Sequence, residues 1–139
     1  MAVEARLAGA GVWPSAQVFI TTDEQTILAG IKLPCVGIKD GPVRTRRLAG
    51  GVEEKILRVH LVAWAPQGKG AAQVTGDSTQ AGVLAMTATC ADLLDGDLLG
   101  IEGMIDARPV EESASRLFLN QAGRSVQQKI ITFEYVRQR

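Results

Sequence analysis

The segment from Ile56 to Trp64 alternates between apolar and mixed positions, as a strand with one buried face does. Apolar residues fill one parity, at Leu57, Val59, Leu61 and Ala63. The other parity carries an arginine, the only histidine of the chain and one of its two tryptophans, namely Arg58, His60 and Trp64. Because successive side chains of a strand point to opposite faces, we expect the first set to face a core and the second to face outward.

Similar alternation predicts further strands and therefore a mainly β chain. A first strand is expected within residues 3–13, a second within 26–36, a fourth within 97–109 and a last one over 129–139. Residues 16–21 either extend the first strand or form a short strand of their own. The core-facing residues of these strands are expected to be Val3, Ala5 and Leu7; Ile27, Ala29, Ile31, Leu33 and Cys35; Leu99, Ile101, Gly103, Ile105 and Ala107; and Ile131, Phe133 and Tyr135.

One segment changes its period from two to three or four residues, which predicts a single helix between the third and fourth strands. Its apolar face would comprise Val83, Met86, Thr87, Cys90, Leu93 and Leu94, and Gly96 is the expected stop. Polar, glycine-rich segments predict long loops at about 39–54 and 65–82, and a hairpin arm at about 109–128.

The order of three strands, a helix and two strands predicts one domain over residues 1–139. It is the order of an OB-fold, a five-stranded, partly open Greek-key barrel with one α-helix between strands 3 and 4. Such barrels bind oligonucleotides on the face of strands 2 and 3 and in the adjacent loops.

Composition narrows the possible function classes. The chain has 15 basic and 15 acidic residues and a pI near 6.6, so any attraction to phosphate depends on local clusters. Cys35 and Cys90 have no ligand at metal-site spacing and are interpreted as small buried thiols. No stretch reaches the roughly 18 apolar residues of a membrane span, so we expect a soluble protein without a membrane partner.

Catalysis is not expected. His60 has no second histidine to act with, and the GDST segment at residues 76–79 lacks the downstream histidine of a serine hydrolase. The GKG segment at residues 68–70 lacks the first glycine and the hydroxyl of a phosphate-binding P-loop. We therefore predict no enzyme activity, no metal site and no cofactor.

RVHLVAW at residues 58–64 and LLDGDLLGIEGMIDAR at residues 93–108 resemble the single-stranded DNA-binding protein family. The likeness implies an OB-fold, self-association into dimers or larger oligomers, and a single strand wrapped across the sheet. Positions where that family stacks bases on aromatic rings match Lys39, Arg58, Trp64 and Val110, of which only Trp64 is aromatic. The family's acidic C-terminal tip is absent from the final VRQR.

These departures are similar to those of the divergent OB-fold proteins of kinetoplastid mitochondrial RNA-editing complexes. That resemblance implies a mitochondrial location, and without it we expect a cytoplasmic one. It also favours RNA over DNA as the single-stranded ligand, within a multiprotein assembly.

Two functions remain open at this point. In the first, the outward side of the third strand and nearby cations bind single-stranded RNA or DNA, through Lys39, Arg44, Arg46, Arg47, Arg58, His60, Trp64, Lys69, Arg108, Arg116 and Arg124. In the second, the chain is a structural subunit that pairs with other OB-fold subunits or with itself, through an edge strand or the first strand, and contact with nucleic acid is incidental.

Overall fold

The computed structural model of the chain describes residues 2–10, 17–22, 33–66, 82–119 and 125–138. Six strands form one open sheet in the order β1–β2–β3–β6–β4, and β5 also pairs with β6. The strands are β1 Val18–Ile20, β2 Cys35–Arg47, β3 Glu53–Pro66, β4 Met104–Glu112, β5 Arg116–Leu119 and β6 Ser125–Gln138. The pairing of β1 with β2 is parallel and the others are antiparallel. The prediction of a mainly β chain is confirmed, but the described residues form this open mixed sheet in place of a closed five-stranded barrel.

β3 and β6 form the centre of the sheet, and the predicted alternation of β3 is confirmed on its core side. Val59, Leu61 and Ala63 are buried in the main core, and Leu57 packs against it. The predicted core parity of the last strand is also confirmed. Its side chains face those of β3 in the pairs Leu57–Tyr135, Val59–Phe133 and Leu61–Ile131.

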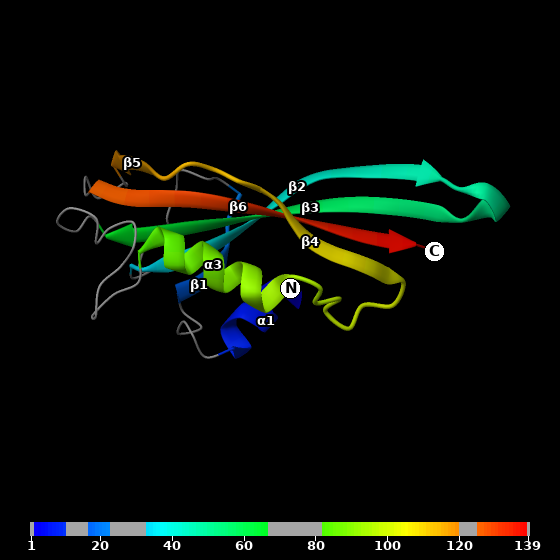
Figure 1. Ribbon diagram of the computed structural model, residues 1–139, viewed down its shortest axis with the longest axis horizontal. Coiled ribbons are helices and arrows are strands. Elements are labelled where there is room, and N and C mark those ends of the chain that lie inside the picture. The colour runs from blue at the N-terminus through cyan, green and yellow to red at the C-terminus, as the bar shows by residue number, and fades with distance from the viewer. Residues whose placement is uncertain (1, 11–16, 23–32, 67–81, 120–124, 139) are drawn as a thin grey trace.

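Helix α3, Val83–Leu94, covers this core face of the sheet (Figure 1). Its buried residues are Val83, Met86, Thr87, Cys90 and Leu94, as the three-and-four spacing predicted. The helix ends before Gly96, whose φ of 72° suits a residue without a side chain. Both the existence and the position of this helix are therefore confirmed.

The predicted first strand is wrong, because residues Ala2–Gly9 form helix α1. Val3 and Leu7 lie four residues apart, so one helix face buries both of them against the core, while Ala5 is exposed. A four-residue spacing satisfies a helix and an alternating strand equally well, which is why the pattern misled. The short-strand alternative for residues 16–21 is confirmed by β1.

The predicted loop at 39–54 is also wrong, because β2 and β3 continue through most of it as a hairpin. The strands are joined by a short 3₁₀ turn, η2 Ala49–Gly51, in which Gly50 and Gly51 adopt positive φ angles of 79° and 77°. We call residues 43–57 the arm. Figure 1 shows the arm extending past the end of β6.

Other predicted boundaries are met in part. β4 begins at Met104, later than expected, and the preceding turns contain Leu99, Gly100 and Gly103 at positive φ. The hairpin that we expected at 109–128 contains the end of β4, all of β5 and the start of β6. Most of the predicted second strand and of the loop at 65–82 lies outside the described residues.

Candidate functional site

The face of the sheet opposite α3, which we call the outer face, carries the predicted outward side of β3. Along β3 this face changes character. Val62 and Trp64 belong to a second buried cluster with Phe19, Cys35 and Val126. Arg58 and His60, nearer the arm, are half-buried among polar partners. The outer face is therefore apolar at one end and charged at the other.

Trp64 lies at the apolar end and has no exposed surface. Its ring stacks on Phe19 of β1, with centroids 5.7 Å apart and planes inclined by 12°. It also lies over Gly37 of β2, where a Cβ atom would come within 2.6 Å of the indole Cζ3. A base cannot stack on a ring that neighbouring residues already cover. Trp64 therefore does not offer the exposed stacking surface that the sequence led us to expect.

Glu134 of β6 organises the charged end of the outer face. Its carboxylate pairs with Arg58 Nε at 3.4 Å and with Arg108 Nη2 at 3.3 Å, so two predicted phosphate-binding arginines share one acidic partner. Arg108 also lies 3.7 Å from Asp106. His60 Nδ1 lies 2.8 Å from Thr132 Oγ1 on the neighbouring strand. Arg58, His60 and Arg108 are thus held within cross-strand pairs.

A second pair lies farther along the arm. Arg46 Nε donates to Glu54 Oε1 at 2.7 Å, and Gln138 Nε2 donates to Glu54 Oε2 at 2.9 Å. The hydrogen bond from Gln138 and the nearby Arg46 hold the pKa of Glu54 below its usual range. These contacts join the end of β6 to the arm. The Glu54 carboxylate also neutralises part of the positive charge of the arm.

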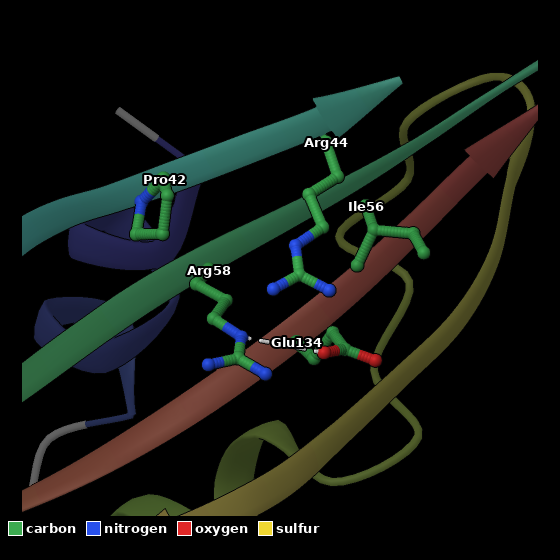
Figure 2. Close-up of a pocket in the computed structure, with 5 residues that line it drawn as sticks. All are labelled: Pro42, Arg44, Ile56, Arg58 and Glu134. Carbon is green, nitrogen blue, oxygen red and sulfur yellow. Dashed lines mark ion pairs between the residues drawn. The ribbon is translucent and has the colours of Figure 1, made fainter. Parts of the chain in front are cut away.

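A hollow of about 200 Å³ opens on the outer face between the ion pairs of Glu134 and those of Glu54. It is lined by Pro42 and Arg44 of β2, Ile56 and Arg58 of β3, and Glu134 of β6 (Figure 2). Figure 2 shows the guanidinium groups of Arg44 and Arg58 pointing toward the same space. No ion pair to Arg44 occurs among the described residues. The hollow therefore presents one uncompensated cation toward solvent.

The remaining predicted binding residues are scattered. Arg47 is exposed near the tip of the arm, and Lys39 is the cross-strand neighbour of His60. Arg116, on β5, donates to Gln128 Oε1 at 2.7 Å. Lys69 and Arg124 lie outside the described residues. The structure brings together Arg44 and Arg58, and it keeps Arg116 at a different part of the sheet.

Sequence reasoning missed Glu134, the carboxylate that pairs with Arg58 and Arg108 on the outer face. The alternation of the last strand could have revealed it. Glu134 alternates with the core residues Phe133 and Tyr135, so it had to point outward beside Arg58 once β3 and β6 were neighbours. The missing information was the pairing of two strands more than 70 residues apart.

Sequence reasoning anticipated contact through an edge strand but did not identify which strands form the edges of the sheet. On the side away from β3, β2 has β1 as its neighbour only over Val36–Ile38, and no described strand lies on that side from Lys39 to Arg47. β4 is the terminal strand on the opposite edge, with β5 beyond it along the same side of β6. Two edges of the sheet are therefore open to other molecules. The β2 edge is rich in basic residues, and the β4 edge carries several acidic residues.

The thiols and other reactive groups form no centre. Burial raises the pKa of Cys35 and that of Cys90 to about 12, which makes both thiols poor nucleophiles at neutral pH. Within the described ranges, no three side chains of His, Cys, Asp or Glu are grouped closely enough to hold a metal ion. No helix in that part of the chain is long and apolar enough to cross a membrane.

Comparison with known proteins yields a similar fold and no family. No family model matches the chain, and no curated protein matches it. Among solved structures, a chain described as "Virion of native gene transfer agent (GTA) particle" matches with a TM-score of 0.56. The match covers 97% of this chain and 91% of that chain at 12% sequence identity. At that identity the likeness concerns the fold alone.

Proposed function

We propose that this protein is a non-catalytic structural subunit of an assembly that contains several copies of it, and that the copies contact one another through the edges of their sheets. One observation carries the proposal. Seven large hydrophobic side chains are exposed among the described residues, and five of them lie on strands at the edges: Ile20, Val43, Ile105, Val110 and Leu117. None lies on the central strands β3 and β6.

Open edges with exposed apolar side chains suit association. An edge strand presents unpaired backbone donors and acceptors, and apolar side chains beside them gain free energy when a partner covers them. These edges are also selective, because Pro42 and Pro109 have no backbone donor and charged residues lie within two positions of each proline, Asp40 and Arg44 around the first and Arg108 and Glu111 around the second. Such an edge rejects indiscriminate strand pairing and favours a partner with matching side chains.

The fold comparison supports the proposal without deciding it. The matched chain belongs to a virion, so a sheet of this shape occurs in a protein that is built into a particle. The proposal needs an open sheet and does not depend on a closed OB barrel or on any particular location in the cell.

Self-association provides the test. Sedimentation velocity from micromolar to about 100 μM protein should show a concentration-dependent oligomer. Leu117→Ser should weaken it, because this edge side chain is 50% exposed and becomes covered. The matched control is Leu84→Ser on α3, which is 43% exposed, lies away from both edges and should associate as wild type does. A chain that stays monomeric throughout this range would refute the proposal.

Binding of single-stranded nucleic acid, RNA above DNA, is a second candidate. It is favoured by Arg44 and Arg58 facing one hollow, with Arg46 and Arg47 exposed on the same arm. Contacts to phosphate alone would make the affinity fall steeply with salt. An oligo-U titration by fluorescence anisotropy at two salt concentrations tests this, with Arg44→Glu expected to weaken binding and Lys55→Glu as the control. Absence of binding at low salt would exclude the candidate.

A further inference from the structure

We propose that the partner at the sheet edges is a second copy of this chain, joined head to tail, with the β2 edge of one copy against the β4 edge of the next. This inference rests on the proposed function and adds to it which two edges meet and the head-to-tail arrangement of the copies.

The two edges carry opposite charge. Over Lys39–Arg47, β2 has four cations and one carboxylate: Lys39, Arg44, Arg46 and Arg47 against Asp40. Over Met104–Glu112, β4 has three carboxylates and one cation: Asp106, Glu111 and Glu112 against Arg108. The chain as a whole has a formal net charge of zero, so copies do not repel one another strongly at a distance. The basic β2 edge of one copy is therefore complementary in charge to the acidic β4 edge of another.

Much of this charge has no partner inside the described part of the chain. Arg46 is paired with Glu54, and Arg108 with Glu134 and Asp106. By contrast, no ion pair involves Arg44 or Arg47 on β2, or Glu111 or Glu112 on β4, among the residues that the structure describes. All four are exposed. They are available to charges on another molecule.

The direction of the strands fits head-to-tail addition. β2, β3, β6 and β4 are successively antiparallel, so β2 and β4 run in opposite directions. A copy placed beside β2 in the same orientation therefore brings its β4 antiparallel to β2. The sheet then continues with the alternation that it already has.

The register of the sheet aligns the charges as well. One row of cross-strand partners runs Lys39–His60–Thr132–Glu111, and another runs Arg44–Ile56–Val136–Asp106. Each row begins with a cation on β2 and ends with a carboxylate on β4. Along Lys39–Arg47, where β1 does not cover the edge, a copy added without sliding along the strands places Glu111 beside Lys39 and Asp106 beside Arg44. The row of Ile38 ends at Glu112 and already holds Ile20 of β1, so the contact stops at Lys39. Opposite charges at cross-strand positions stabilise a sheet, whereas like charges destabilise it.

Side chains carry this contact more than a backbone ladder does. The carbonyl of Ala107 on β4 already accepts a hydrogen bond from Gly96 N at 2.8 Å, and Pro42 and Pro109 have no N–H to donate. A two-fold arrangement is disfavoured, because β2 against β2 opposes arginines and β4 against β4 opposes carboxylates. Head-to-tail contacts of one kind generate a ring if the rotation closes and a filament if it does not.

The test uses two variants that each spoil one edge. Arg44→Glu reverses a charge on the β2 edge, and Glu111→Lys reverses one on the β4 edge. Lys55→Glu, on the side of the arm away from Arg44, and Asp92→Lys, exposed on α3, make the same changes in net charge elsewhere. All five proteins are compared by sedimentation velocity at low salt, and equal thermal melting temperatures show that the variants are folded.

The inference requires a specific pattern of results. Each edge variant alone should associate about tenfold more weakly than wild type or worse, and both controls should match wild type. Mixing Arg44→Glu with Glu111→Lys should restore association, because the intact β4 edge of the first meets the intact β2 edge of the second. An oligomeric wild type whose edge variants are unaffected, or do not complement each other, overturns this inference and leaves the proposed function standing. A monomeric wild type overturns both.

Discussion

Gly37 is the residue that allows Trp64 to lie flat against β2. A Cβ atom at this position would come within 2.6 Å of the indole Cζ3 and 2.9 Å of Cη2, closer than side chains approach one another. With Phe19 on one side and Gly37 beneath, the ring is enclosed by two neighbouring strands. The largest buried side chain of the outer face is therefore a packing element of the sheet.

Gly37→Ala should lower the free energy of unfolding by about 1–3 kcal/mol, because the added methyl group overpacks a rigid ring. Urea denaturation followed by circular dichroism measures the change. Gly9→Ala is the matched control, since a Cβ atom there meets nothing within 4 Å, and its stability should stay within about 0.5 kcal/mol of wild type. An equally stable Gly37→Ala protein would show that Trp64 does not occupy this position.

For β3, the sequence was enough to predict which side chains share a face. It was not enough to predict which of them are exposed. Val62 and Trp64 share their face with Arg58 and His60, as expected, yet only the last two retain polar surroundings. What covers Trp64 comes from β1 and β2, through a glycine whose role depends on a neighbour 27 positions away. Likewise, Arg58 appears free in the sequence because Glu134 reaches it only through the pairing of β3 with β6.

At the scale of elements, periodicity identified α3 because six positions repeated the helical spacing. It failed for α1, where only Val3 and Leu7 are buried and both periods accommodate them. It failed again for the arm, where the residues are polar on both faces and alternation is lost. The arm is recognisable in three dimensions by cross-strand pairs such as Arg46 with Glu54, which composition alone assigns to a solvated loop.

The Arg6–Asp97 ion pair joins α1 to the segment that follows α3. Arg6 Nε lies 2.7 Å from Asp97 Oδ2, and Asp97 Oδ1 accepts a hydrogen bond from Leu99 N at 2.9 Å. The Leu99 N–H and, after it, the Arg6 guanidinium hold the pKa of Asp97 below its usual range. Because the folded pKa is lowered, this stabilisation is present above the unfolded value of about 4 and is lost as the pH falls through the folded value.

Asp97→Asn should therefore lower the free energy of unfolding at pH 7 by about 0.2–1 kcal/mol, the range of partly exposed ion pairs. The difference from wild type should shrink as the pH is lowered below about 4. Urea unfolding at several pH values measures it, with the exposed Asp95→Asn as the control. A difference that is constant with pH would contradict the role of the carboxylate charge.

For the whole molecule, the mainly β class and the central helix could be predicted, because both depend on local periodicity. The open sheet, its strand order and its exposed edges could not, because they depend on which distant strands pair. The sequence resemblance to single-stranded DNA-binding proteins remains an expectation about family. The covered Trp64 and the paired Arg58 leave the outer face of β3 less open to a ligand than the edges of the sheet are.

Association through oppositely charged edges should weaken as salt is added. The Debye length falls from about 10 Å at 0.1 M to about 3 Å at 1 M, so pairs at a solvated edge are screened. The apparent association constant of wild type should drop between these salt concentrations, and that of the Leu84→Ser control should drop in parallel. Association that is unchanged or strengthened by salt would indicate an apolar contact and contradict the charge pairing.

The position of β6 has a consequence for how this protein is made. It is the last of the six strands to leave the ribosome, yet it lies between β3 and β4 and pairs with β5 as well. Until it emerges, β3 has a bare side and β4 and β5 have no sheet to join. Productive folding must therefore wait for the final strand, and the nascent chain exposes aggregation-prone surface during that delay.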